Sequence, residues 1–323
     1  MGRDLYAGVD LGGTKILTAI VAADGTILAR AKRDTPFENG VSALLAALSG
    51  SVHDALSAAR ATADRLVAIG MGSPGPLDLA RGILLRTPNI GVRRVRFREH
   101  FEKEFHVPLV LDNDVHMAVF GEMHAGSGRG ARNVIGIWVG TGVGGCVIVD
   151  GKVIHGINQN AGEIGHMILD AKKSSPGKSR GTLEWEASKT GIVRHLRKAV
   201  RKGEKTMLAK YLGHHERLHS SHLAEALAAG DGPARRALER SARYVGIAMA
   251  NLFNVFAPEL FILGGGVVED VGAPYVRIAA SAANENAFST ELAKIKVAAT
   301  HLKGDAGALG AALAARERHA TPA

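Results

Sequence analysis

The chain has 323 residues, which suits two domains of about 150 residues with a cleft between them better than one ordinary core. Hydrophobic residues make up 46% and charged residues 22%, which excludes a disordered or fibrous protein, and no apolar run approaches the ~20 residues of a membrane span. The net charge of +9 does not by itself separate a nucleic-acid partner from attraction of a nucleotide.

The N-terminal region predicts a β-meander. An apolar strand at 6–10 leads into a glycine-rich turn, a second strand at 16–21, an Asp-Gly turn and a third strand from Ile27. Residues 134–154 repeat this order of elements, which indicates two similar domains rather than a solenoid. Because no signal-peptide pattern is present, we expect a cytoplasmic protein with no membrane partner.

Helical and strand patterns alternate after each meander. The expected helices cover 41–61, 97–105, 183–200 and 220–256, the last broken near Gly230, and the expected buried strands cover 66–70, 109–111 and 261–263. This alternation predicts an α/β sheet in each domain, with ligands at the carboxyl ends of the strands.

Three glycine-rich turns follow expected strands. Residues 10–15 read Asp-Leu-Gly-Gly-Thr-Lys at a strand-to-strand turn, which differs from a P-loop in context and spacing. Its glycines would let the backbone approach phosphate oxygens and Asp10 would hold Mg²⁺ directly or through water, while a plain glycine hairpin is the alternative. Residues 140–145 form a second such turn, and residues 264–266 form a third, against which a nucleobase or ribose would lie.

Acidic and histidine side chains supply candidates for catalysis. Asp112, Asn113 and Asp114 come directly after a buried strand. An aspartate there would accept the proton of a hydroxyl that attacks phosphorus, and the alternative is that Asp112 or Asp114 caps the following helix. Glu163 and His166 form a carboxylate and imidazole pair three residues apart, for which a purely structural role is the alternative.

Eight motifs in chain order resemble the ROK group of bacterial sugar kinases and repressors, within the actin/hexokinase superfamily. They are residues 10–15, 70–75, 87–89, 113–114, 140–144, 161–166, 181–184 and 263–267. The resemblance covers nearly the whole chain and implies two RNase H-like α/β lobes, a duplicated βββαβα plan, on either side of a central cleft. It places a small lobe at 1–115 plus about 300–323 and a large lobe at 116–299.

The resemblance also implies an ATP-dependent hexose kinase, with Asp114 as the general base for transfer of the γ-phosphate to a sugar 6-hydroxyl. It assigns sugar binding to Asn89, Asn113, Asp114, Glu163, His166 and Glu184. It assigns the phosphates with their Mg²⁺ and the adenosine of ATP to Asp10, Gly12, Gly13, Thr14, Lys15, Thr141, Gly142, Gly265 and Gly266. Phosphoryl transfer asks a protein mainly for alignment and charge neutralisation, and this division of roles fits that demand.

The sequence departs from the family pattern at the zinc site. Most members bind structural zinc through three cysteines and the histidine of a Gly-His pair, but residues 172–184 contain no cysteine, and Cys146 is the only one in the chain. A tetrahedral structural site needs about four such ligands. We therefore predict that His166 binds sugar without zinc and that the metal requirement is limited to the Mg²⁺ carried with ATP.

Several alternatives stay open at this point. Glucose is the favoured sugar on family frequency alone, with mannose, fructose and N-acetylhexosamines behind it. The basic stretches at 172–180 and 194–205 leave polyphosphate open as a second donor, although solvated surface charge is the favoured interpretation. The histidines at His214, His215, His219 and His222 are expected at the surface.

A sugar-responsive repressor is the alternative outside the kinases. Repressors of the family carry a helix-turn-helix before the first glycine motif, whereas nine residues precede Asp10 in this sequence. We therefore expect no nucleic-acid partner. The expected partners are a small sugar, ATP and a second copy of the chain, as a homodimer or homotetramer.

Overall fold

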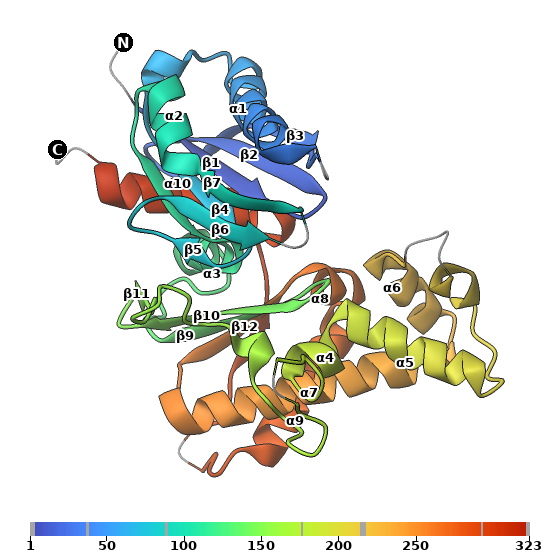
Figure 1. Cartoon of the computed structure of the whole chain (residues 1–323). Coiled ribbons are helices and arrows are strands. Elements are labelled where there is room, and N and C mark those ends of the chain that lie inside the picture. The colour runs from blue at the N-terminus through green and yellow to red at the C-terminus, as the bar shows by residue number, and fades with distance from the viewer. Residues whose placement is uncertain are drawn as a thin grey trace. The chain divides into compact units, whose positions relative to one another are not determined.

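The computed structural model describes residues 4–36, 39–87, 90–175, 177–213, 218–291 and 293–320. The chain forms two compact units (Figure 1). Unit 1 comprises residues 1–130, 155–161 and 304–323, and unit 2 comprises residues 131–154 and 162–303. Each unit is built around one five-stranded sheet.

The sheet of unit 1 has the strand order β3-β2-β1-β4-β8. Its strands are β1 (Leu5–Leu11), β2 (Lys15–Ala22), β3 (Ile27–Asp34), β4 (Leu66–Ser73) and β8 (Leu109–Asn113). The first three form an antiparallel meander, and β4 and β8 continue the sheet in parallel with β1. The registers pair Asp10 with Gly72 and Gly72 with Asp112, so both aspartates lie at the edge where the parallel strands end.

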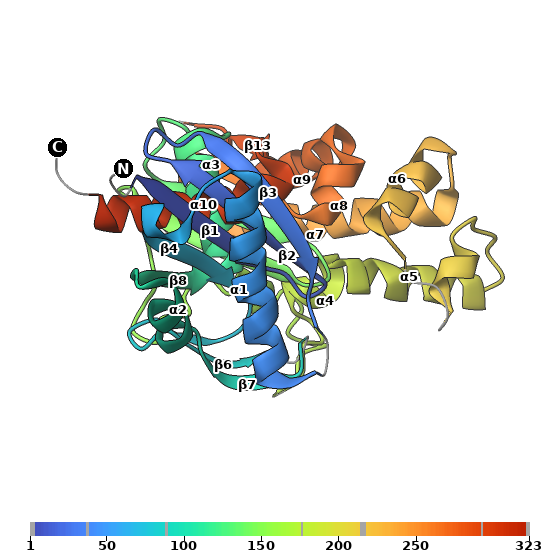
Figure 2. The same cartoon turned by 90° about the horizontal axis from the view of Figure 1, so that it is seen from above.

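Helices cover both faces of this sheet. They are α1 (Gly40–Ala58), η1 (Ala63–Arg65), α2 (Phe97–Phe105), α3 (Asp114–Ala125) and α10 (Ala306–His319), and a small sheet adds β5 (Leu77–Asp78), β6 (Ile83–Thr87) and β7 (Val92–Arg96). Because successive strand residues point to opposite faces, Leu5 and Val9 join the core with α1 and α2, whereas Gly8 meets α10. Figure 2 shows α1 along β2 and β3, the strands on which it packs.

Helix α1 is long and rich in apolar residues. It is the one helix in the described part of the chain that is long and apolar enough, by these two criteria alone, to cross a membrane. Its apolar residues Leu44, Leu48 and Val52 are fully buried in the core of unit 1. Packing on the sheet therefore accounts for its apolar character.

Helix α10 approaches β1 and β4 closely because glycines face it. A Cβ atom on Gly70 would overlap the carbonyl oxygen of Ala311, and one on Gly8 would overlap that of Ala308. The same helix packs along α3. This packing fixes the first turn of α10 beside the end of β1, where Asp10 lies.

Unit 2 repeats the arrangement with the strand order β11-β10-β9-β12-β13. Its strands are β9 (Val134–Val139), β10 (Val143–Val149), β11 (Lys152–Val153), β12 (Leu260–Gly264) and β13 (Val297–Ala299). Its helices are η2 (Ile164–His166), α4 (Leu183–Ala187), α5 (Lys189–Arg201), η3 (Ala209–Leu212), α6 (Ser220–Ala228), α7 (Gly232–Phe256), α8 (Gly266–Val271) and α9 (Ala273–Asn286), and η4 (Lys303–Asp305) follows β13 at the return to unit 1. As in unit 1, an antiparallel meander is extended by two parallel strands.

The expected α/β fold with two similar sheets is confirmed, and so is the break of the long helical region at Gly230, between α6 and α7. The division between the units differs from the expected boundary at 115–116. Because α3 packs on α10, residues 116–130 belong to unit 1, and the segment 155–161 joins the same unit.

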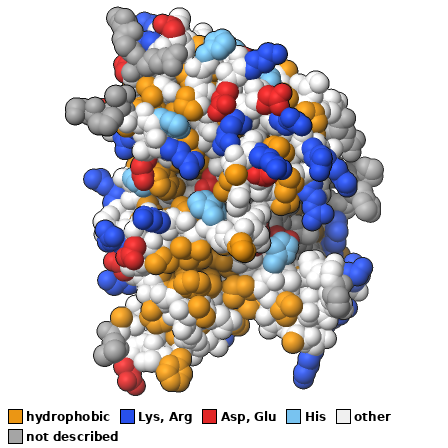
Figure 3. Space-filling view, turned by 60° about the vertical axis from the view of Figure 1, so that its left-hand side comes forward, with side chains coloured by type: hydrophobic (Ala, Val, Ile, Leu, Met, Phe, Trp, Pro, Cys, Tyr) orange, Lys and Arg blue, Asp and Glu red, His pale blue; other side chains and the backbone are white. Residues whose placement is uncertain are grey.

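Charged and hydrophobic side chains are both displayed on the surface. On the face in Figure 3, lysines and arginines are scattered among acidic and uncharged side chains, and hydrophobic side chains gather toward one end. In unit 2 the exposed hydrophobic residues include Val255, Phe256 and Phe288. They lie near one another, since the Phe288 N–H donates to the Asn254 side-chain oxygen (3.0 Å).

The packing of α10 yields a stability prediction. Replacing Gly70 with Ala should lower the midpoint of thermal unfolding by about 5 °C, because overpacking a close contact costs about 1–3 kcal/mol. The matched control is Gly304→Ala, where a Cβ would meet nothing within 4 Å. Calorimetry or circular dichroism melts should show the control within about 1 °C of the parent. Equal midpoints for all three proteins would contradict the glycine-dependent packing.

Candidate functional site

The turn between β1 and β2 carries the first glycine motif. The Gly12 N–H donates to the Lys15 carbonyl (3.0 Å), and the Thr35 hydroxyl donates to the Gly12 carbonyl (2.8 Å). These bonds close a tight turn whose far side is exposed at Thr14 and Lys15. The turn therefore presents an ammonium group and a hydroxyl outward, as a phosphate-binding turn requires.

Asp10 lies at the base of this turn in an unusual electrostatic setting. Its carboxylate faces the start of α10, where a Cβ on Gly307 would come within 2.7 Å of it. Burial, and second the negative charge of Asp114, raise the pKa of Asp10 to about 7. A divalent cation would relieve this repulsion, since hard cations such as Mg²⁺ prefer carboxylate oxygens. Asp10 therefore fits the role of a direct or water-mediated Mg²⁺ ligand.

The turn from β8 into α3 places Asp114 at the first position of a helix. Its cap is Asn113, whose side-chain oxygen accepts from the N–H groups of Val115 (2.9 Å) and His116 (3.3 Å). The Asp114 carboxylate also accepts from Val115 N–H (2.9 Å). The alternative that Asp112 or Asp114 supplies the helix cap is therefore wrong, because Asn113 is the cap.

The glycine turn between β9 and β10 gathers the candidate residues of unit 2. The Glu184 carboxylate accepts from Val143 N–H (3.0 Å), and a Cβ on Gly142 would collide with that carboxylate. The Thr190 hydroxyl donates to the Thr141 carbonyl (2.8 Å), which ties the turn to α5. Glu184 and the glycine turn therefore form one rigid element, with the Thr141 side chain exposed.

Glu163 and His166 lie on the short turn around η2, which packs against β10. Their side chains are 48% and 64% exposed and approach each other only to 3.9 Å, between the Glu163 carboxylate and His166 Nε2. An exposed pair with so loose a contact contributes little to stability. The pair therefore adds little to the stability of the turn, and its binding role stays a prediction.

The third glycine turn follows β12. Gly264 is paired with Trp138 of β9, and Gly265 has a φ of +84° and lies against the backbone of Val139. The turn that carries Gly265 and Gly266 is therefore next to the β9–β10 turn at the same sheet edge. Within unit 2, the residues assigned to phosphate and to adenosine are neighbours.

The segment that carries zinc-binding cysteines in other members is held here by ordinary contacts. Gly181 accepts backbone hydrogen bonds from Leu169 (2.9 Å) and Asp170 (3.0 Å), and the Lys173 ammonium lies 2.6 Å from the Asp170 carboxylate. Lys173 also lies 3.8 Å from the buried Glu186. A backbone bridge and ion pairs therefore support the loop before Glu184.

Glu186 anchors this support in the core of unit 2. It is 2% exposed and accepts from Arg240 (2.9 Å) and contacts His195 Nε2 (3.3 Å). Burial alone would raise the pKa of Glu186, but the hydrogen bond and charge of Arg240, with a smaller contribution from His195, lower it overall. The acid therefore stays ionised and paired.

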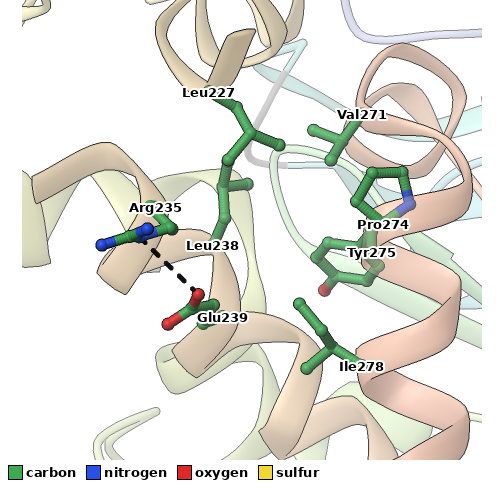
Figure 4. A pocket seen from close by; sticks show the side chains of 8 residues that line it. All are labelled: Leu227, Arg235, Leu238, Glu239, Val271, Pro274, Tyr275 and Ile278. Carbon is green, nitrogen blue, oxygen red and sulfur yellow. Dashed lines mark ion pairs between the residues drawn. The ribbon is translucent and has the colours of Figure 1, made fainter. Parts of the chain in front are cut away.

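An apolar pocket lies elsewhere in unit 2. It has a volume of about 280 Å³ between α6, α7, α8 and α9, and Figure 4 shows Leu227 and Leu238 on one side and Tyr275 and Ile278 on the other. The Arg235 and Glu239 side chains pair at its rim (3.9 Å). None of the described candidate residues lines it, so it is not the predicted site.

Sequence reasoning located the strand ends but missed some contributors. Asn89 lies outside the described residues, as do His214 and His215. Gly307 beside Asp10, and His155 beside Asp112 (2.7 Å), were not expected. Both come from segments remote in sequence, and no local pattern marks them. The assigned roles of the candidate residues themselves stay predictions.

Comparison with known proteins places the chain and its fold in a family. The ROK family profile matches residues 6–318, and the chain therefore belongs to the ROK family. It is 35% identical over 265 residues to a glucokinase of Halalkalibacterium halodurans (81% of this chain, 80% of the relative) and 31% identical over 325 residues to a glucokinase of Thermotoga maritima (96% and 97%). It is also similar to a ROK family glucokinase from Streptomyces griseus solved in complex with glucose and AMPPNP, with a TM-score of 0.83, 30% identity and coverage of 97% and 99%.

The loop without cysteines generates a metal prediction. Elemental analysis of the purified chain should find well below one zinc per chain, because the described part of the 166–184 region holds its shape through backbone and ion-pair contacts. Thermal unfolding should not change on addition of a chelator. A stoichiometric zinc lost together with stability on chelation would contradict this expectation.

Proposed function

We propose that the chain is a cytoplasmic ATP-dependent hexose kinase that transfers the γ-phosphate of ATP to the 6-hydroxyl of a sugar, with glucose as the first substrate. The observation that carries the proposal is the pair of aspartates at the strand ends of unit 1. Asp114 stands at the first position of α3 and its charge acts on Asp10, below a phosphate-type glycine turn. The glucokinase relatives support the choice of sugar.

In this proposal the unit 1 residues carry the chemistry. The Asp114 carboxylate accepts the proton of the sugar hydroxyl while the hydroxyl oxygen forms a bond to the γ-phosphorus. The bond between the γ-phosphorus and the bridging oxygen of the β-phosphate breaks, and ADP is released. The exposed Thr14 and Lys15 and the backbone of Gly12 and Gly13 hold the phosphates. Mg²⁺, held with ATP near Asp10, would neutralise the charge on the phosphate oxygens.

The unit 2 residues supply orientation. Glu163, His166 and Glu184 would accept and donate hydrogen bonds to sugar hydroxyls, and Asn113 and Asn89 of unit 1 would add to them. Thr141 and Gly142 would contact phosphate, and Gly265 and Gly266 would pack on the adenosine. Binding that aligns the hydroxyl with phosphorus lowers the barrier through proximity. The proposal also includes assembly of the chain into a homodimer or a homotetramer.

A coupled assay of ADP release over a panel of hexoses tests the proposed function. Glucose should show the highest kcat/KM, ahead of mannose, fructose and N-acetylhexosamines, and ATP should be preferred over polyphosphate. If no hexose stimulates ADP release, the kinase proposal fails. Sugar-dependent binding of an operator DNA at physiological salt would instead favour the regulator alternative.

Replacement of the proposed base should separate chemistry from binding. Asp114→Asn should lower kcat by about 10²–10⁴-fold, the usual contribution of a positioned general base, and leave sugar affinity within a few-fold. The matched control is Asp54→Asn, an exposed acid of unit 1 paired with Arg33, which should keep its rate within about twofold because such surface pairs contribute little. Steady-state kinetics with calorimetric sugar titration measures both quantities. Wild-type turnover by Asp114→Asn would rule out this base.

The raised pKa of Asp10 predicts a pH dependence. Since Asp10 must be ionised to hold Mg²⁺ and its pKa is about 7, kcat/KM for MgATP should fall about tenfold per pH unit below pH 7 and level off above it. Profiles from pH 5.5 to 8.5 measure the effect. Asp10→Asn should have a lower plateau and lack this limb. An identical acid limb in both proteins would assign it to another group.

A further inference from the structure

Asp112 is the centre of a compact polar cluster in unit 1 that the mechanism above does not use. One of its oxygens accepts from Asn113 N–H (2.7 Å) and contacts His116 Nδ1 (2.9 Å), and the other contacts His155 Nε2 (2.7 Å). The side chain of Asp112 is 13% exposed and that of His116 only 2%. The cluster thus joins the end of β8, the first turn of α3 and a segment more than 40 residues later in the chain.

His116 bridges two acceptors. Its second nitrogen, Nε2, lies 3.0 Å from the carbonyl oxygen of Ala161, while Nδ1 faces Asp112. A carbonyl oxygen only accepts, and so does an ionised carboxylate. The His116 ring therefore lies at hydrogen-bond distance from both oxygen atoms and connects Asp112 to the Ala161 carbonyl.

The electrostatics of Asp112 agree with this arrangement. Burial alone would raise the pKa of Asp112, but the hydrogen bonds from His116 and His155, together with their charge, hold it well below its usual range. Asp112 and His116 therefore form a largely buried hydrogen-bonded pair. Removing one member of such a pair leaves the other uncompensated.

The segment 155–161 is fastened to unit 1 at further points. The Leu77 N–H donates to the Asn160 side-chain oxygen (3.2 Å), and the Leu79 N–H donates to that of Gln159 (2.7 Å). Gly162 and Glu163 follow Ala161 directly in the chain, so the segment ends two residues before a side chain assigned to the sugar.

We propose that Asp112, His116 and His155 are positioning residues for sugar binding. The buried His116 side chain connects the strand end that carries Asn113 and Asp114 to the Ala161 carbonyl, two residues before Glu163 in the chain. The proposal rests on the proposed kinase function and deepens it. The contacts of the cluster described above reach Asn113 and the Ala161 carbonyl, on the side assigned to the sugar, so its loss should weaken sugar binding and spare ATP binding.

A bound metal ion is the rival interpretation of the same atoms. Ligand atoms of Asp112, His116 and His155 lie within 4.8 Å of one another, and a histidine that donates its second N–H to a carbonyl is common in metal sites. However, Asp112 uses a different oxygen for each histidine, at hydrogen-bond lengths of 2.9 and 2.7 Å. The contacts favour a proton-mediated network.

Two variants of His116 test the bridge itself. His116→Asn keeps an amide nitrogen near the Nδ1 position and His116→Gln keeps one near Nε2, so each retains one end of the bridge. Each should raise the KM for glucose about tenfold, the usual cost of unpairing one buried polar group, while the KM for ATP changes less than about twofold. Asp112→Asn should do the same. A loss of stability alone would lower the active fraction, and hence kcat, and would leave both KM values unchanged.

The matched control is His124→Gln, on the same helix. His124 is partly exposed and bonds the Phe120 carbonyl of its own helix (2.9 Å), so both KM values should stay at the parent level. Hydrogen exchange followed by mass spectrometry supplies a readout that needs no activity. Amides of residues 155–163 should exchange about tenfold faster in His116→Gln than in the parent or the control.

The outcomes distinguish a failure of the proposed kinase function from a failure of the proposed His116 bridge. If the parent phosphorylates no hexose but exchange accelerates in His116→Gln, the kinase proposal fails and the bridge stands. Unchanged exchange and unchanged glucose KM would overturn the bridge. Equal increases in the KM for glucose and ATP would overturn its assignment to sugar binding. One metal ion per chain that is lost in His116→Gln would overturn the proton-mediated network in favour of the metal site.

Discussion

The structure depends on how three carboxylates are accommodated at one sheet edge. The ends of β1 and β8 bring Asp10, Asp112 and Asp114 into the same part of unit 1, where the negative charges of neighbouring acids repel one another. The three acids have different surroundings. Asp112 is paired with two histidines, Asp114 stands at the start of a helix, and Asp10 has a raised pKa, mainly through desolvation and second through the charge of Asp114. These different surroundings fit the proposal that Asp10 binds a metal ion and Asp114 accepts a proton.

The packing of unit 1 serves this arrangement. Helix α10 reaches the strand ends because glycines on β1 and β4 leave room for its backbone, and Gly307 leaves room for the Asp10 carboxylate. In unit 2 the equivalent glycine turn, between β9 and β10, packs against Glu184. Glu184 fills the space that Gly142 leaves and accepts from Val143, which makes the glycine turn and the acid one element. The same fold plan therefore builds an acidic edge in one unit and a hydrogen-bonding edge in the other.

Much of this organisation could be predicted from the sequence because it depends on local patterns. The duplicated meander, the strand ends and the break at Gly230 each follow from hydrophobic period and turn residues. The contacts that complete the site are not local. His155 reaches Asp112 across 43 residues, and Lys173 reaches Glu186 through a folded loop, so neither pairing leaves a spacing signature.

The cap of α3 could not be predicted from the local sequence. Asp112, Asn113 and Asp114 are all good capping residues. The backbone direction at the end of β8 selects Asn113 as the cap of α3, so the carboxylates of Asp112 and Asp114 are available for other contacts. The boundary between the units could not be predicted from the local sequence either. Helix α3 belongs to unit 1 because it packs on α10.

The central claim is that the chain transfers the γ-phosphate of ATP to the 6-hydroxyl of a sugar. Phosphorus NMR of the products formed from glucose and ATP tests it most directly, since a phosphate on a primary carbon couples to two protons. The account predicts glucose 6-phosphate in equal amount to ADP. Release of ADP with inorganic phosphate alone, or a phosphate on another hydroxyl, would contradict it.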